Sequence, residues 1–379
     1  MYDVVIAGAG PAGCACALAL SRGGHRVALL DARTFPRDKV CGDAIPGAAV
    51  RSLRRLADEL GIPAPEPAGA VAVRHARFYG DGARPIELAW RLPAYNSTRL
   101  AFDAWLSESV RAYTTTHLRL GKRVGGVTVH SDRVVVEASG AALEAKLIVG
   151  CDGANSIVAR ALTGTRLDRR HHLAAVRAYF RGVRGAAPAT NDVYFLRDWQ
   201  PGYAWVFPVG DDRYNVGVGM SSAAVSERRV DLRAVLDTVT RSAPALAGRF
   251  AEAERCGPTV GFGLPVGSRT VPASGERFLL CGDAASLIDP LGGHGIDTAI
   301  ASGILAAEQA DWCLRHERFD AGAMRPYEAA LERRIRPTLR RNGYVVRAGT
   351  RAPWLLDVAG ALDRLPGGQA VKGLVQGWL

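Results

Sequence analysis

The sequence Asp-Val-Val-Ile-Ala-Gly-Ala-Gly-Pro-Ala-Gly at residues 3–13 decides the fold. Its apolar first half predicts a buried strand, and the small residues at 11–22 predict a helix that follows a glycine-rich turn. A second apolar run at 26–30 predicts another strand. Together these elements form a β-α-β unit of about 30 residues, the context in which a glycine-rich turn binds phosphates.

The three glycines of this turn have separate physical roles. Gly8 permits the tight turn, Gly10 lets a pyrophosphate approach the backbone, and Gly13 lets the helix pack closely on the strand. The helix N-terminus offers free N–H groups and a positive dipole end to the phosphates. Asp31, at the end of the second strand, is placed to accept hydrogen bonds from a ribose diol. The unit predicts a dinucleotide site; the alternative is a glycine turn in an unrelated α/β protein.

Composition bounds the class of protein. The chain has 379 residues, 48% of them hydrophobic and 22% charged, which is typical of a globular protein with one large or two joined domains. We expect no membrane-spanning helix and no secretory signal. The seven cysteines are odd in number and lack framework spacing, which favours a reducing compartment and a cytoplasmic location. No metal site is predicted, because Cys14 and Cys16 do not share a helix face.

The formal net charge of +11 comes almost entirely from arginine. Such a charge attracts anions, which include cofactor phosphates, nucleic acid and acidic lipid. The arginines are scattered, with no interleaved aromatic residues and no nucleic-acid-binding module. Nucleic-acid binding is therefore not expected, whereas a peripheral membrane contact is left open.

A second glycine-rich region follows some 270 residues after the first. The stretch Leu280-Cys281-Gly282-Asp283-Ala284-Ala285 predicts a buried strand that delivers Asp283 to a tight turn. Gly292-Gly293-His294-Gly295 then opens a helix at Ile296. These glycines leave backbone N–H groups free for a polar ligand edge; the alternative is a turn with a helix cap.

Further elements are expected from the hydrophobic periodicity. A strand pair is predicted at 71–90, with its turn at Gly80-Asp81-Gly82. Antiparallel strands are predicted at 174–180, 192–197, 203–209 and 213–219, and helices at 298–316 and 325–347.

At this point the sequence resembles a family. The first glycine turn, Gly150-Cys151-Asp152-Gly153-Ala154-Asn155-Ser156 and Gly282-Asp283 are similar to the three FAD signatures of the para-hydroxybenzoate hydroxylase-like flavoproteins, in the same order. The resemblance covers nearly the whole chain. It implies an α/β fold with a Rossmann-type FAD-binding domain, an antiparallel-sheet substrate domain and C-terminal helices. The expected boundaries are 1–70, 98–170 and 272–330 for the FAD-binding domain, 71–97 and 171–271 for the substrate domain, and 331–379 for the helical segment.

The resemblance also implies which residues hold non-covalent FAD. Asp283 would bind the ribityl and pyrophosphate region, and Arg99 resembles an arginine that contacts the cofactor in the family. Residues 292–296 would present N–H groups to the flavin N1–C2 edge, and Asp152 would support fold and cofactor together. The full expected set is Gly8, Gly10, Pro11, Ala12, Gly13, Asp31, Ala32, Arg33, Cys41, Gly42, Arg99, Asp152, Gly153, Asp283, Pro290, Gly292, Gly293, Gly295 and Ile296.

Two segments narrow the resemblance to the geranylgeranyl reductase group. Lys39-Val40-Cys41-Gly42-Asp43 looks like its K-x-C-G segment. Tyr203-Ala204-Trp205-Val206-Phe207-Pro208, followed after eight residues by Gly217-Val218-Gly219, matches its Y-x-W-x-F-P…G-x-G signature. The three aromatic residues alternate on a strand and share one face. That face suits the wall of an apolar substrate pocket over the flavin; an ordinary aromatic core is the alternative.

Two catalytic candidates follow. Cys41 is either a proton donor beside the flavin or a packing residue. His294 stands where relatives often carry an acidic or other polar residue; it either titrates near neutral pH or is only a hydrogen-bonded loop histidine.

The resemblance implies a reductase, in which reduced FAD delivers a hydride to a C=C bond of an isoprenoid or other apolar secondary metabolite and an acid donates the proton. The alternative is a monooxygenase that hydroxylates or epoxidises through a flavin C4a-hydroperoxide. A non-enzymatic scaffold is disfavoured by the intact glycines, and halogenation by the missing W-x-W-x-I-P pattern. No second glycine fingerprint exists for NAD(P)H. NADPH or NADH therefore docks transiently, or a separate reductase or ferredoxin supplies the electrons.

Overall fold

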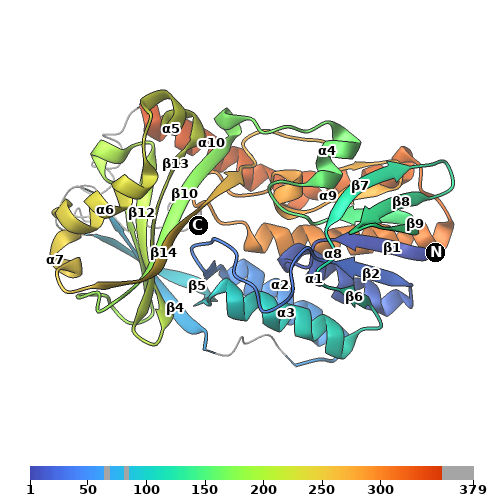
Figure 1. Ribbon diagram of the computed structural model, residues 1–379, viewed down its shortest axis with the longest axis horizontal. Helices are drawn as coiled ribbons and strands as arrows, with labels where there is room; N and C mark the ends of the chain where they lie inside the picture. Colours follow the sequence, from blue (N-terminus) through green and yellow to red (C-terminus); the bar gives the residue numbers. More distant parts are fainter. Residues whose placement is uncertain (64–68, 81–84, 352–379) are drawn as a thin grey trace.

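The computed structural model describes residues 1–63, 69–80 and 85–351, which form two eight-stranded sheets with helices packed around them (Figure 1). The first sheet has the order β15-β16-β9-β1-β2-β6, and β8 and β7 extend it from β9. Its centre is parallel: β1 pairs with β2 and β9, β2 with β6, and β9 with β16. The strands are β1 (Tyr2–Ala7), β2 (Val27–Leu30), β6 (His117–Arg119), β7 (Val124–Val129), β8 (Val134–Ala138), β9 (Ala141–Gly150), β15 (Ser274–Gly275) and β16 (Phe278–Leu280).

The second sheet has the order β14-β10-β13-β12-β11-β4-β5-β3 and is antiparallel except between β11 and β4. It occupies the other end of the molecule from the first sheet (Figure 1). The short strand β3 lies early in the chain, yet it pairs with β5 at the edge of this sheet. The strands are β3 (Ala44–Ile45), β4 (Val71–Tyr79), β5 (Ile86–Asn96), β10 (His172–Arg181), β11 (Thr190–Tyr194), β12 (Gly202–Gly210), β13 (Arg213–Ser221) and β14 (Glu254–Pro265).

Two helices that are far apart in the sequence pack against each other beside the first sheet. Helix α8 crosses α1 at a point where Gly303 meets Ala12; a Cβ at Gly303 would lie 2.2 Å from the Ala12 carbonyl oxygen. The close approach therefore needs a residue without a side chain. The helices are α1 (Pro11–Leu20), α2 (Gly47–Leu60), α3 (Arg99–Tyr113), α4 (Ile157–Thr163), α5 (Ser222–Arg228), α6 (Leu232–Ser242), α7 (Ala247–Phe250), α8 (Ile296–His316), α9 (Ala321–Arg334) and α10 (Arg336–Arg351).

The α/β fold class expected from the sequence is confirmed, and so is the β-α-β unit at its start. The single helix expected at 325–347 is wrong: α9 ends at Arg334, Ile335 has φ −122° and ψ −57°, and α10 begins at Arg336. Residues 81 and 82 of the expected turn and residues 352–379 of the expected C-terminal segment lie outside the described residues.

Helices α5, α6 and α7 were not predicted from the hydrophobic periodicity of the sequence. Helix α6 nevertheless carries a readable signal: Asp231 caps its N-terminus by accepting from two backbone N–H groups. Apolar residues then recur at Leu232, Val235, Leu236 and Val239, all buried, which is helical spacing. This face packs on the second sheet and closes a separate hydrophobic core there.

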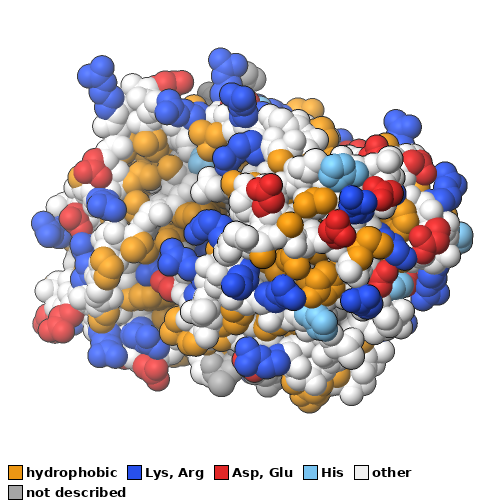
Figure 2. Space-filling view, turned by 45° about the vertical axis from the view of Figure 1, so that its right-hand side comes forward, with side chains coloured by type: hydrophobic (Ala, Val, Ile, Leu, Met, Phe, Trp, Pro, Cys, Tyr) orange, Lys and Arg blue, Asp and Glu red, His pale blue; other side chains and the backbone are white. Residues whose placement is uncertain are grey.

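Within the described ranges, no helix is both long and apolar enough to span a membrane. On the face drawn in Figure 2, lysine and arginine side chains are distributed among hydrophobic and acidic ones rather than gathered in one block.

Candidate active site

The three glycine-containing signatures, separated by more than a hundred residues each, meet around one cavity of about 340 Å³. The first contributes Gly8, Gly10, Pro11 and Ala12, from the turn between β1 and α1. The second contributes residues 151–155, directly after β9, and the third contributes residues 281–283, directly after β16. Strands β1, β9 and β16 are parallel neighbours, so their carboxyl ends bring all three signatures to the same edge.

The glycines of the first turn are required for different reasons. Gly8 has φ +102°, and a Cβ there would lie 2.3 Å from the carbonyl oxygen of Cys151. A Cβ on Gly13 would lie 1.8 Å from the carbonyl oxygen of Gly8. At Gly10, by contrast, the nearest neighbour of a Cβ would be an Arg37 nitrogen at 3.8 Å, and the backbone has an ordinary φ of −77°. The protein alone therefore does not need glycine at position 10, whereas a group bound against this turn would.

The N-terminus of α1 is free to hold an anion. Pro11 is its first residue, no side chain caps it, and its first turn carries no acidic residue. Its first backbone N–H groups lack intrahelical partners, and the helix dipole favours negative charge at this end. Together with the room beside Gly10, this arrangement fits the diphosphate of a dinucleotide.

Two acidic residues organise the basic side chains beside the turn. Asp31 accepts from the backbone N–H groups of Ala9, at 3.0 Å, and Arg33, at 2.9 Å, so its carboxylate is fixed at the end of β2. Arg37 pairs with Asp103 at 2.9 Å and reaches Asp31 at 3.5 Å. Its guanidinium is therefore held over the glycine turn, close to where the diphosphate would lie.

Arg99 lines the cavity, but its charge is used by the protein. Its guanidinium binds Asp103 through two hydrogen bonds of 2.7 Å, and both side chains are buried. Burial alone lowers the pKa of Arg99, but the adjacent Asp103 carboxylate outweighs it and raises the pKa above its ordinary value. Arg99 therefore stays charged beside the cavity as part of an internal ion pair.

The remaining two signatures hold their acids differently. Asp283 accepts from the Lys39 ammonium at 3.0 Å, and both residues line the cavity. Asp152 accepts from Ser156 Oγ at 2.5 Å and from the backbone N–H of Ile157 at 2.7 Å, so it caps the start of α4. Asp152 thus ties the cavity wall to the fold, as a supporting residue would.

The residues expected to bind the cofactor fall into two groups. Those that line the 340 Å³ cavity are Gly8, Gly10, Pro11, Ala12, Asp31, Ala32, Arg33, Arg99, Asp152, Gly153 and Asp283. The others, which lie beyond it, are Gly13, Cys41, Gly42, Pro290, Gly292, Gly293, Gly295 and Ile296. Most of the second group belong to the 39–43 loop and to the loop that precedes α8.

The aromatic residues expected at a substrate wall do share one face of β12. The rings of Tyr203 and Trp205 are 5.9 Å apart, and those of Trp205 and Phe207 are 6.4 Å apart. Trp205 lies opposite Gly217 on β13, where a Cβ would lie 2.2 Å from its ring. The first glycine of the G-x-G signature therefore makes room for the indole. Tyr203 donates to the carbonyl oxygen of Gly292 at 2.7 Å, so the wall reaches the loop before α8.

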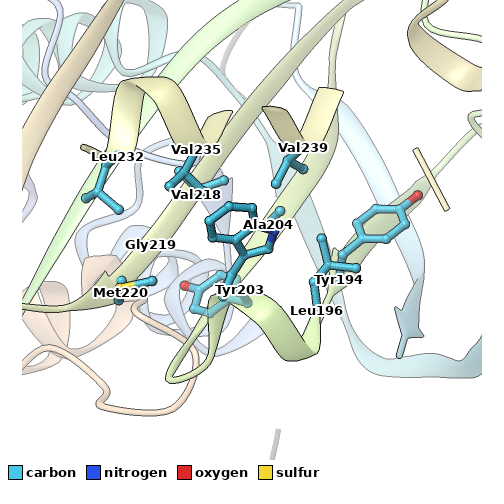
Figure 3. A pocket seen from close by; sticks show the side chains of 11 residues that line it. Tyr194, Leu196, Tyr203, Ala204, Val218, Gly219, Met220, Leu232, Val235 and Val239 are labelled. Atoms are coloured by element: carbon cyan, nitrogen blue, oxygen red, sulfur yellow. The ribbon is translucent and has the colours of Figure 1, made fainter. Parts of the chain in front are cut away.

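The other face of β12 is closed. There, Ala204 and neighbouring residues of β13 face Leu232, Val235 and Val239 of α6, as Figure 3 shows. The cavity left between them is about 10 Å³, which is room for at most one water. This side of the sheet is packed core.

The 39–43 loop lies against this wall. A Cβ on Gly42 would be 3.5 Å from the Phe207 ring and 3.6 Å from Trp205 Nε1. Cys41 is half-buried, and burial raises the pKa of its thiol. The thiol therefore stays protonated at neutral pH, as a proton donor must.

Asp43 is a buried acid beside Cys41. It accepts from the Tyr179 hydroxyl at 2.7 Å and from Asn215 Nδ2 at 2.8 Å. Burial raises its pKa to about 6, although both hydrogen bonds act in the opposite direction.

His294 lies in the loop before α8, with a third of its side chain exposed. Its Nδ1 is 2.9 Å from Asp297 Oδ1, and its Nε2 is 4.0 Å from Asp289 Oδ1. Burial lowers its pKa, but the two carboxylates outweigh burial and raise it to about 9. The imidazole is therefore cationic at neutral pH, in a loop whose backbone N–H groups face Asp289.

The His294 pair should make stability depend on pH. Because the folded pKa is raised from 6.5 to about 9, its stabilising contribution is complete below pH 6.5 and disappears as the pH rises through 9. We expect the melting temperature of His294→Gln to fall furthest below that of the parent near pH 6, and the two to converge near pH 9. A His316→Gln variant at the far end of α8 is the control. A difference that stays constant with pH would rule out this ion pair as its source.

Sequence reasoning missed several residues that the structure brings to the site. Arg37 and Lys39 line the cavity, and Asn215 binds the 39–43 loop. Lys39 and Asp43 were part of a recognised segment but received no role, and Asn215 lies in the eight-residue spacer of the aromatic signature. Its alternation with Gly217 on one strand is the signal that could have placed it on the aromatic face.

Comparisons with known proteins agree with this geometry. Residues 1–309 match the family model described as FAD binding domain. The menaquinone reductase of Mycolicibacterium smegmatis is 33% identical over 325 residues, which cover 81% of this chain and 75% of that protein. The geranylgeranyl diphosphate reductase of Rhodobacter capsulatus is 29% identical, with 82% and 75% covered.

A solved structure of a related protein has the same fold. The geranylgeranyl bacteriochlorophyll reductase-like protein of Thermoplasma acidophilum superimposes with a TM-score of 0.78 at 25% identity, covering 91% of this chain and 87% of the other. The family match at residues 1–309 covers all three signatures that meet at the cavity. The chain therefore belongs to the FAD binding domain family, as an FAD-dependent oxidoreductase of the geranylgeranyl reductase group.

Proposed function

We propose that this oxidoreductase reduces C=C bonds of an apolar, isoprenoid substrate. The observation that carries the proposal is the contact between the 39–43 loop and the aromatic wall, because it places Gly42, the neighbour of Cys41, against an apolar surface. Burial also raises the pKa of the Cys41 thiol. Relatives named for reduction of menaquinone and of geranylgeranyl diphosphate support the substrate class, since both molecules carry isoprenoid chains.

The residues of the cavity bind the cofactor in this proposal. The N-terminus of α1, the backbone at Gly10 and the Arg37 guanidinium hold the diphosphate, and Asp31 holds the ribose. Lys39 and Asp283, joined by their ion pair, border the ribityl region. The loop at 292–296, fixed through Asp289 and Tyr203, faces the flavin edge.

When bound and reduced, FAD supplies a hydride to one carbon of the double bond. The Cys41 thiol donates a proton to the other carbon, so that two electrons and two hydrogens are added. The thiolate left on Cys41 is stabilised by the nearby Arg99 charge, which lowers the pKa of this thiol against the effect of burial, and it is reprotonated from solvent. Tyr203, Trp205 and Phe207 hold the apolar chain and exclude water.

The electron source completes the proposal. We infer that NADPH or NADH reduces the flavin after transient docking, with a separate electron-donor protein as the other source. The cysteines of the described residues are all unpaired, which supports a reducing, cytoplasmic location.

An anaerobic turnover experiment tests this function. FAD-loaded protein is reduced with dithionite and mixed with a menaquinone or a geranylgeranyl substrate, and products are analysed by mass spectrometry. We expect flavin reoxidation together with a product whose isoprenoid chain carries two additional hydrogens. Reoxidation only after dioxygen is admitted, with a product heavier by one oxygen, would show the monooxygenase instead.

A further inference from the structure

Asn215 joins two parts of the site, the 39–43 loop and the aromatic wall, through one side chain. Its Nδ2 donates to the carbonyl oxygen of Cys41 and to the carboxylate of Asp43, both at 2.8 Å. Its Oδ1 accepts from the Trp205 indole N–H at 2.8 Å. The side chain is fully buried. Its amide N–H groups and its carbonyl oxygen therefore all bind the 39–43 loop or the aromatic wall.

The sheet fixes where this amide lies. Asn215 pairs directly with Phe207 across β12 and β13, and Gly217, two residues further, pairs with Trp205. Residues 215 and 217 share a face of β13 because side chains alternate along a strand. The amide is thus held at the rim of the indole by the backbone register.

Asp43 makes the connection rigid. It is fully buried, and its φ of +64° lies in the left-handed region. Besides the bond from Asn215, its carboxylate accepts from Tyr179 Oη at 2.7 Å and from the backbone N–H of Arg99 at 3.3 Å. The turn that follows Cys41 is therefore anchored to β10, to β13 and to the start of α3.

We propose that Asn215 is a positioning residue that locks the Cys41 loop against Trp205, so that the proton donor and the substrate wall form one unit. This inference rests on the proposed function for its catalytic meaning. Asn215 does not line the 340 Å³ cavity. It acts by holding the backbone of Cys41 and the indole ring at a fixed separation.

The accessibility of Cys41 reports this lock without any substrate. Cys41 and Cys256 are the two partly exposed cysteines of the described residues, so a Cys256→Ser background isolates Cys41. In FAD-loaded protein, alkylation of Cys41 by iodoacetamide is followed by mass spectrometry. We expect Asn215→Ala to raise the rate at least about fivefold, with flavin content unchanged.

Turnover gives the second measurement. We expect Asn215→Ala to lower kcat about tenfold or more while KM changes less than about threefold, because the apolar wall remains but the thiol is misplaced. Asn191→Ala is the matched control: Asn191 is a buried amide of the same sheet, bonded to Asn96 rather than to the 39–43 loop. It should keep the parent alkylation rate and kcat.

Each outcome decides the inference. Parent values for Asn215→Ala would overturn it, and so would equal losses in Asn215→Ala and Asn191→Ala, which would indicate general weakening of the sheet. Should Asn215→Ala not fold, Trp205→Phe removes the indole donor but keeps an aromatic ring, and an unchanged alkylation rate there would overturn the lock. Faster alkylation in a protein that reduces no C=C bond would keep the lock and reject the proposed function.

Discussion

A protein carrying Gly10→Val is expected to fold as the parent does and to bind no FAD. The backbone at Gly10 has an ordinary φ, and an added Cβ would meet only the flexible end of Arg37, at 3.8 Å. The branched side chain instead fills the space of the diphosphate. We expect the affinity for FAD to fall at least about 100-fold, close to 3 kcal/mol. Flavin absorbance after gel filtration and the melting temperature of the FAD-free protein measure the two effects separately.

The matched control is a valine at Gly13, the last glycine of the same signature. In Gly13→Val the new Cβ would lie 1.8 Å from a backbone oxygen of Gly8, and neither backbone can move without separating α1 from β1. We expect this variant to lose about 3 kcal/mol or more of stability and to be mostly unfolded or insoluble. Normal flavin content in Gly10→Val would mean that the cavity beside this turn is not where the diphosphate binds.

Replacement of the candidate proton donor is expected to have the second large effect. In Cys41→Ser the hydroxyl keeps the size of the side chain, but its pKa is far higher than that of the thiol, so it donates a proton poorly. We expect C=C reduction to slow by roughly 100-fold. Flavin content and reduction of the flavin by dithionite should not change, because Cys41 lies outside the diphosphate cavity. Single-turnover reoxidation of the reduced flavin by substrate is the measurement.

Cys256→Ser is the control, since Cys256 is the other partly exposed cysteine and lies on β14. It should retain full activity. Product formation at the parent rate in Cys41→Ser would reject the donor role and favour the oxygenase alternative, which needs no such acid.

The sequence by itself determined the elements that rest on local periodicity. The strand–turn–helix at residues 3–20, the start of α8 at Ile296 and the shared face of the β12 aromatic residues all follow from spacing along a single segment. Each depends on contacts within a few residues, where the repeat of a helix or strand fixes which side chains meet. The break between α9 and α10 could not be predicted from spacing along one segment, because the residues on both sides of Ile335 have helical patterns.

The tertiary structure alone decided how the segments meet. Asp43 binds Asn215 across 172 residues, and Lys39 pairs with Asp283 across 244. No periodicity encodes such distant pairs, since they depend on the register of β12 on β13 and on the path of the 39–43 loop between the sheets. The tertiary structure also distinguished the roles of Gly10 and Gly13. Glycine is needed at position 13 because a Cβ there would collide with a backbone atom of the protein, whereas at Gly10 the chain leaves room for the expected ligand.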